Sequence, residues 1–234
     1  MGAPSGSAPD AAGPRREDEL RAWIAGPAFT CLGGRAAARR GGLRTVALGD
    51  MHAPATASRL HAELEQFVLD TRDQDFVTFV ALFDGPDHAT ELEFEESMWR
   101  LLRELHAVDG TSYGWSPDAS PDPSAPSFAY SVAGEAFFLV GMHPRASRTA
   151  RRFTVPAIAF NPHAQFTRMK RTGVYAGLQE RIRALELRLQ GSTNPMLAEF
   201  GEASEARQYS GREVTDAWRC PFPLPPPPSG GDTS

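Results

Sequence analysis

The chain lacks most of the features by which common folds and cofactor sites are recognised. Its 234 residues include two cysteines, Cys31 and Cys220, and no C-x-x-C pair, which excludes a zinc ribbon and a thioredoxin-like redox site. It contains no G-x-G-x-x-G, Walker, G-x-S-x-G or H-E-x-x-H motif. The common nucleotide-binding, hydrolase and zinc-protease interpretations therefore lack support.

Lysine is also scarce, since Lys170 is the only lysine in the sequence. The formal net charge is -5, so no overall basic field would attract nucleic acid or anionic lipid. The apolar runs are too short to span a bilayer. Residues 1–13 lack the basic start and apolar run of a secretory signal. We therefore expect a cytoplasmic protein with reduced thiols and with neither nucleic acid nor membrane as a partner.

The two ends of the chain have compositions that do not build a core. Residues 1–15 are small and polar, and residues 221–234 are rich in proline, followed by Ser229, Gly230 and Gly231. Such segments bury too little apolar surface to offset the entropy of ordering. We expect disordered tails at 1–15 and 221–234 around one domain at 16–220. A solvated C-terminal tail is favoured over a polyproline ligand for a partner domain.

Between these ends the periodicity alternates between strand and helix. Strands are expected at 43–49, 76–83, 128–132, 136–142 and 157–160, and helices at 55–70, 91–107 and 174–190. The two strands at 128–132 and 136–142 are joined at Gly134-Glu135, with the spacing of a hairpin. The order predicts an α/β (α+β) fold in which helices flank a mixed sheet.

The segment after the strand at 136–142 is rich in arginine. If it forms a helical turn, Arg148, Arg151 and Arg152 lie on one face at i, i+3 and i+4 spacing. Guanidinium groups so placed repel one another unless an anion such as a phosphate, a carboxylate pair or haem propionates neutralises them. A solvated turn, or ion pairs with the chain's own acids, explains the spacing equally well.

Two histidines follow predicted strands. His143 directly precedes Pro144, which favours extended geometry and lets the imidazole project from the strand end. His163 follows the strand at 157–160, so both rings could converge on one pocket. A single histidine is nonetheless more often a structural residue than a metal ligand.

Two polar segments remain without an assigned role. The loop at 108–126 is long enough to gate an entrance, and residues 201–212 either form a solvated loop or cover a polar site.

Several short runs, taken in order, resemble the YqcI/YcgG family. They are HPRASRTARRF (143–153), FNPHAQF (160–166), LQGSTNPML (189–197), FGEASEARQYSGR (200–212) and WRCPF (218–222). The resemblance covers roughly residues 23 to 222 and is closest to the guanitoxin-biosynthesis-type branch of haem-dependent N-hydroxylases.

That resemblance implies a haem-dependent monooxygenase of secondary metabolism. Its cofactor would be b-type haem without covalent attachment, which agrees with the absence of a C-x-x-C-H motif. O₂ would be the co-substrate, an electron-donating reductase the partner, and an arginine-like guanidine nitrogen the site of hydroxylation. A homodimer is compatible with the chain.

The resemblance also implies roles for individual residues. His143 is the first choice of axial haem ligand and His163 the second, with Arg148, Arg151 and Arg152 pairing the propionates. Carboxylates suited to orienting a cationic substrate are Glu202, Glu205, Asp109 and Asp122.

Two other functions stay open. One is a haem carrier or sensor without oxygenase activity. The other is an anion or nucleic-acid binder built on the arginine-rich segment, against which the acidic net charge argues.

Overall fold

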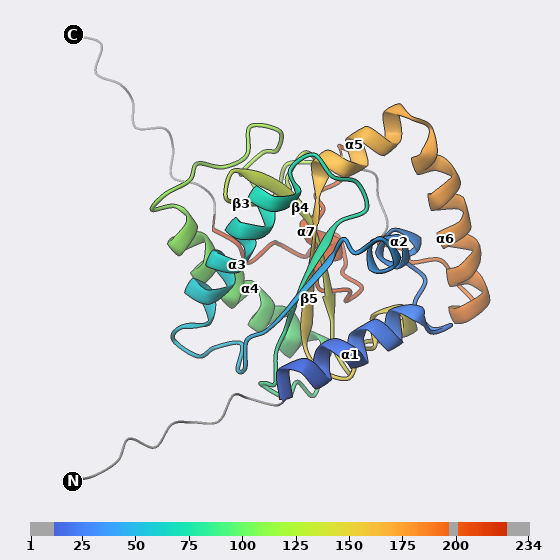
Figure 1. Ribbon diagram of the computed structural model, residues 1–234, viewed down its shortest axis with the longest axis horizontal. Coiled ribbons are helices and arrows are strands. Elements are labelled where there is room, and N and C mark those ends of the chain that lie inside the picture. The colour runs from blue at the N-terminus through green and yellow to red at the C-terminus, as the bar shows by residue number, and fades with distance from the viewer. Residues whose placement is uncertain (1–11, 197–200, 224–234) are drawn as a thin grey trace.

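The computed structural model describes residues 12–196 and 201–223 (Figure 1). In chain order the elements are α1 (Ala12–Ala25), α2 (Leu32–Arg40), β1 (Leu43–Ala47), α3 (Thr56–Thr71), β2 (Thr78–Leu82), α4 (Glu91–Asp109), β3 (Tyr130–Val132), β4 (Glu135–Met142), the 3-10 turn η1 (Thr149–Arg151), β5 (Ala157–Pro162), α5 (His163–Arg171), α6 (Val174–Gln190) and α7 (Ala206–Tyr209).

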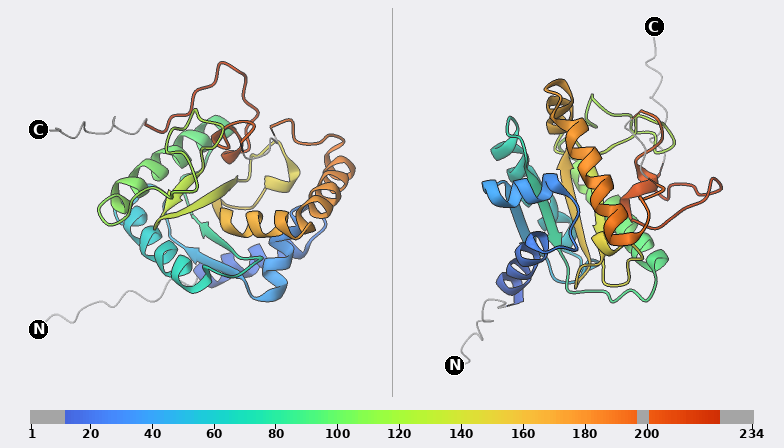
Figure 2. Two further views of the ribbon diagram at one scale, coloured as in Figure 1. Left: turned by 90° about the horizontal axis from the view of Figure 1, so that it is seen from above. Right: turned by 90° about the vertical axis from the view of Figure 1, so that its right-hand side faces the viewer.

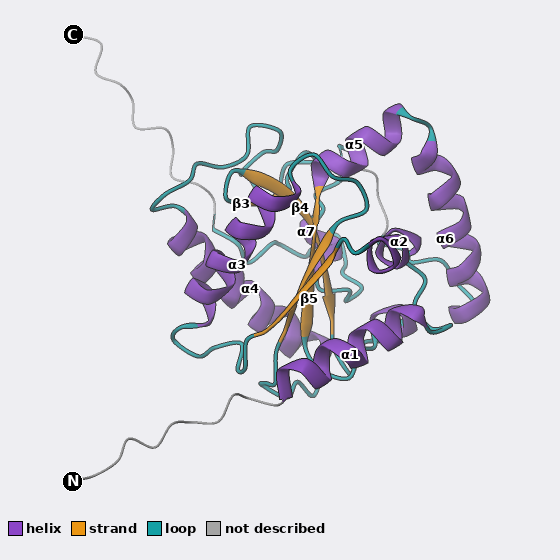
Figure 3. Ribbon diagram, viewed as in Figure 1, coloured by secondary structure: helices purple, strands orange, loops and turns teal. Residues whose placement is uncertain are grey.

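The five strands form one mixed sheet with the order β1-β2-β5-β4-β3. β1 and β2 are parallel and are connected through α3, whereas every other pair is antiparallel. β3 pairs only with the start of β4, from Glu135 to Phe137, which leaves the rest of β4 as an edge. Figure 3 shows this twisted sheet at the centre of the helices. The predicted mixed sheet flanked by helices is confirmed.

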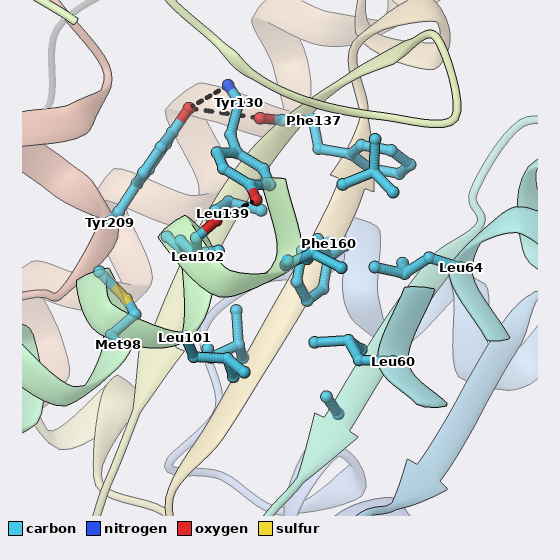
Figure 4. Packing of buried hydrophobic residues seen from close by; sticks show 14 of the residues in the cluster. Leu60, Leu64, Met98, Leu101, Leu102, Tyr130, Phe137, Leu139, Phe160 and Tyr209 are labelled. Carbon is cyan, nitrogen blue, oxygen red and sulfur yellow. Dashed lines mark hydrogen bonds between the residues drawn. The ribbon is translucent and has the colours of Figure 1, made fainter. Parts of the chain in front are cut away.

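Helices α3 and α4 cover one face of the sheet. Strand residues alternate between faces, so Phe79, Ile158 and Phe160 point toward these two helices. They meet apolar side chains of α3 and α4 such as Leu64 and Leu102, and Figure 4 shows this packing. This cluster is the main core of the protein.

The opposite face is covered by α1, α2, α5 and α6, as the view from above in Figure 2 shows. A smaller cluster packs Leu20 and Ile24 of α1 against Val80, Met142 and Ala159 of the sheet. This is the side on which the candidate site lies.

The hairpin between β3 and β4 forms as predicted, with its turn one residue earlier. Ala133 and Gly134 both have positive φ, 52° and 71°. Positive φ at both central residues is typical of the tight turn that matches the twist of a hairpin.

The described structure extends a few residues beyond the expected domain of 16–220 at both ends. α1 begins at Ala12, so residues 12–15 are helical, because Leu20 and Ile24 of the same helix anchor it to the sheet. At the other end Phe222 is buried against Trp99 and Trp115. The rest of the expected tails, 1–11 and 224–234, lies outside the described residues.

No helix in the described ranges is long and apolar enough to cross a membrane.

Candidate functional site

A cavity of about 320 Å³ lies between the sheet and the helices α1, α2, α5 and α6. Its floor consists of the strand residues that face away from the main core: Thr78, Val80, Phe138, Val140, Met142, Ala159 and Asn161. Trp23 and Ile24 of α1 and Phe166 of α5 extend the apolar wall. The volume is in the range of about 300–1,000 Å³ typical of small-molecule and cofactor sites.

Helix α6 covers this cavity without packing onto the sheet. It is amphipathic as predicted, yet none of its residues is buried. Leu178 and Ile182, on the predicted apolar face, line the cavity instead. Apolar helix faces are normally buried against the core. Part of the apolar face of α6 is therefore turned to the cavity.

Arg151 places a buried positive charge in the wall of this cavity. Its Nη1 donates to the carbonyl oxygens of Gly141 at 3.2 Å and Tyr209 at 3.0 Å, along the free edge of β4. Within the described residues Arg151 forms no ion pair, and its Nε and Nη2 donate to no acceptor. Desolvation lowers the pKa of Arg151 to about 10. Glu186, which lines the same cavity, and Glu91 act on this guanidinium from beyond ion-pair distance. A buried guanidinium with no carboxylate in direct contact is suited to an anionic ligand.

The other two predicted arginines have different surroundings. Arg148 lines the cavity and bonds to Glu186 of α6 at 3.4 Å and to the carbonyl oxygen of Ser192 at 3.0 Å. Arg152 donates to the carbonyl oxygen of Ala146 at 2.9 Å and is absent from the cavity lining. Arg148 and Arg151 therefore share the cavity wall although they bond to different acceptors, whereas the side chain of Arg152 lies outside it.

His163 lies in the cavity wall at the start of α5. Its Nε2 is 2.9 Å from Oε2 of Glu205, a residue that is 5% exposed and also lines the cavity. Of the four carboxylates considered for a cationic substrate, Glu205 is the one in the cavity wall. The segment that holds it, residues 204–210, packs along β4, so the predicted polar segment is largely buried.

His143 lies outside the cavity lining and on the α4 side of the sheet. It is fully buried and stacks on Phe94 with ring centroids 4.4 Å apart. Neither ring nitrogen has a hydrogen-bond partner within the described residues. Desolvation lowers the pKa of His143 to about 4, so the ring is neutral at pH 7. The structure therefore does not bring His143 and His163 to one pocket.

The sequence interpretation missed Cys31, which lies in the cavity wall at the N-cap of α2. Its Sγ accepts a hydrogen bond from the backbone N–H of Gly34 at 3.3 Å. The sequence feature that could have indicated this position is Cys31-Leu32-Gly33-Gly34, which precedes a short segment rich in alanine and arginine. It was missed because the helix α2 itself was not predicted.

Two further features bear on the site. The loop at 108–126 contributes no residue to the cavity wall, so its predicted gating role has no support from the described part of the chain. Within that part, no group of three or more histidine, cysteine or acidic side chains is placed to hold a metal ion by itself.

Comparison with known proteins identifies one relationship. The sequence model of the YqcI/YcgG family matches residues 20–223 of this chain. No curated protein and no solved structure matches it significantly.

Proposed function

The chain belongs to the YqcI/YcgG family, and from that premise we propose that it binds haem in the cavity and hydroxylates a guanidine-type nitrogen. The observation that carries the proposal is the pairing of an apolar cavity with a buried guanidinium in its wall, that of Arg151, which forms no ion pair within the described residues. A planar ligand with an apolar body and anionic side groups matches both features. Haem is such a ligand.

The residues present fit this group. The strand floor on one side and Leu178 and Ile182 of α6 on the other offer two apolar surfaces to a planar ring. Arg151 and Arg148, at the edge formed by β4 and η1, are placed to pair propionates through charge-assisted hydrogen bonds. Two side chains of the kinds that ligate haem iron, Cys31 and His163, face the same space.

Bound haem iron would supply O₂ activation, with electrons delivered by a partner reductase. The chain's own residues would position the substrate. Glu205 is a buried carboxylate at the cavity wall, and carboxylates bind guanidinium groups in a bidentate manner. His163, bonded to Glu205, would hold that carboxylate in place.

Haem binding is tested by an absorption spectrum of the full chain expressed with a haem precursor. Ile182→Asp and Leu187→Asp form a matched pair, since both lie on α6 but only Ile182 lines the cavity, whereas Leu187 is 55% exposed. We expect a Soret band in wild type and in Leu187→Asp, and its loss or strong reduction in Ile182→Asp. Equal haem content in both variants would place the haem elsewhere.

The role of the arginines is tested by titrating the apo chain with haem and with its dimethyl ester, in which the propionates are neutral. Wild type should prefer haem, and Arg151→Gln should reduce that preference by about tenfold or more, the range of one charge-assisted hydrogen bond of about 1.5–3 kcal/mol. An unchanged preference would remove Arg151 from the propionate site.

Turnover is tested by adding a reductase and O₂ to the haem-loaded chain with arginine-like compounds. Formation of an N-hydroxylated product supports the oxygenase. Stable haem binding without any product across the guanidine series would favour a haem carrier or sensor instead.

A further inference from the structure

Helix α6 is held in the structure differently from the helices of the main core. α3 and α4 each bury a full face, whereas no residue of α6 is buried. Leu178 and Ile182 of α6 line the cavity, so this helix covers a space and not the core. Figure 1 shows α6 at the outer side of the molecule, where it is reached from α5. A movement of α6 would therefore open the cavity and leave the main core intact.

The N-terminal end of α6 has the geometry of a hinge. α5 ends at Arg171 and α6 begins at Val174, and between them Gly173 has a positive φ of 73°. A Cβ placed on Gly173 would have no atom within 4 Å, and this N-cap gives the first turn no side-chain hydrogen bond. Residues at the ends of elements absorb the backbone rotation in hinge movements. At 1.5 Å per residue α6 is about 25 Å long, so a rotation at Gly173 moves its far end the most.

That far end is fastened by polar contacts to the segment at η1. Oε1 of Gln190 accepts hydrogen bonds from N and Oγ1 of Thr149, both at 2.9 Å. Oε2 of Glu186 accepts from Nη2 of Arg148 at 3.4 Å and from the N–H of Asn194 at 3.2 Å. We call these contacts of Glu186 and Gln190 the latch. Hydrogen bonds between partly buried polar groups have a small net free energy, so a latch of this kind opens more readily than a packed core.

The segment that receives the latch is itself fixed to the rest of the protein. N and Oγ of Ser147 both donate to Oε1 of Glu91, at the start of α4, at 2.8 Å. Nη1 of Arg151 donates to the carbonyl oxygen of Gly141 in β4 at 3.2 Å. The latch thus joins a helix without a buried side chain to a segment tied to the core helix α4 and to the sheet. When the latch opens, α6 is the part that moves.

We propose that α6 is a lid over the cavity, which pivots at Gly173, is held shut by the latch and controls the entry of the ligand. The closed cavity of about 320 Å³ is close to the lower limit of the range of about 300–1,000 Å³ for such sites. Outward movement of α6 widens it for a ligand as broad as haem. Closure of a lid also keeps water from a bound ligand. The inference rests on the proposed function for the identity of the ligand, whereas the movement of α6 does not depend on it.

Two variants open the latch in different ways. Gln190→Ala removes the contacts to Thr149 without a change of charge, and Glu186→Ala removes the carboxylate that Arg148 binds. Glu180→Ala is the matched control for both. Glu180 is an exposed carboxylate of the same helix and lies outside the cavity lining.

The movement is measured on the full, ligand-free chain as the distance between two spin labels, by double electron–electron resonance. One label is attached at Arg188→Cys, near the latched end of α6, and the other at Glu96→Cys on α4, both at exposed positions. Cys31→Ser and Cys220→Ser remove the native thiols. A second pair, Glu63→Cys with Glu96→Cys, joins α3 to α4 and serves as the reference for the core.

The latch variants should shift the α6–α4 pair toward longer distances. We expect the long-distance population to rise about two- to tenfold over wild type and Glu180→Ala, the range of one hydrogen bond. The α3–α4 distances should be the same in all four chains. An α6–α4 distance distribution that neither Gln190→Ala nor Glu186→Ala alters overturns the lid.

Entry of the ligand is measured as the association rate of haem and of its dimethyl ester, by stopped-flow absorption. Both should enter Gln190→Ala faster than wild type by a similar factor of about two to ten, because a lid acts on either ligand regardless of the propionate charge. Movement of α6 with unchanged association rates overturns its control of entry. A chain in which α6 moves but no haem binds supports the lid and rejects the proposed function, so the two failures are distinguishable.

Discussion

Oε2 of Glu205 lies 2.9 Å from Nε2 of His163, although 42 residues separate the two in sequence. Both side chains are largely buried, with 6% and 13% exposure. The hydroxyl of Tyr209 lies 3.5 Å from the same carboxylate oxygen. The pair joins the start of α5 to the segment that follows the free edge of β4, so it fixes one wall of the cavity.

Removing the carboxylate should destabilise the protein. We expect Glu205→Gln to cost about 1–3 kcal/mol, because a buried ring nitrogen loses a charged partner. Urea unfolding measures the change, and Glu213→Gln, an exposed carboxylate on the same segment, is the control. In a double-mutant cycle with His163→Ala, the two changes should be non-additive by about 0.5–3 kcal/mol. Simple additivity would show that the pair contributes no coupling.

A second buried carboxylate, Glu95, anchors the C-terminal segment to α4. Its oxygens accept from Ser210 Oγ at 2.7 Å, Arg212 Nη2 at 2.8 Å and Trp218 Nε1 at 2.9 Å. Glu95→Gln should therefore destabilise the chain by about 3–5 kcal/mol, the cost of breaking a buried ion pair. The neighbouring Glu96 is exposed, so Glu96→Gln should stay within about 0.5 kcal/mol of wild type. Thermal unfolding of the two variants distinguishes them, and equal midpoints would contradict the anchoring role.

The close approach of α4 to β4 depends on Gly141. A Cβ at this position would lie 2.7 Å from Cε1 of Phe94 and 2.9 Å from the carbonyl oxygen of Tyr209. Because one of these atoms belongs to the backbone, Gly141→Ala should cost about 1–3 kcal/mol through overpacking. Gly114→Ala is the control, since nothing lies within 4 Å of its Cβ position. Guanidinium unfolding of both variants checks the prediction, which fails if Gly141→Ala is as stable as Gly114→Ala.

Stability should depend on pH through His143. Burial lowers the pKa of His143 from 6.5 to about 4, so between these values the unfolded chain binds the proton and the folded chain does not. The free energy of unfolding therefore falls as pH drops from 6.5 toward 4, by roughly 3 kcal/mol from this group, and the loss levels off below 4.

His143→Phe isolates this contribution. The ring nitrogens of His143 bond to nothing in the described part of the chain, so phenylalanine keeps the stack on Phe94 without a titrating group. Its unfolding free energy, measured on the apo chain, should vary less between pH 6.5 and 4 than that of wild type. The remaining slope includes His88, whose pKa desolvation also lowers. An unchanged slope would show that His143 does not titrate as a buried neutral ring.

Local patterns determined the main elements of this protein. The apolar run at 136–142 and the hairpin spacing before it identified β4. The i, i+4 spacing of Leu60 and Leu64 identified α3, because it reflects which side of the helix is buried. α2 escaped prediction because LGGRAAARR has two glycines and little apolar periodicity, and it forms where its neighbours hold it. The family resemblance also came from short runs of sequence, and the match over residues 20–223 confirms it.

Only the tertiary structure decided which residues share the site. Arg148, Arg151 and Arg152 are close in sequence, but their side chains separate toward different carbonyl and carboxylate acceptors. His143 and His163 both follow strands, yet one side chain lies on the α4 side of the sheet and the other in the cavity wall. Cys31 meets the cavity because α2 packs over the same sheet face as α6. Sequence spacing fixes neighbours along one element, whereas a cavity is defined by elements that meet across the sheet.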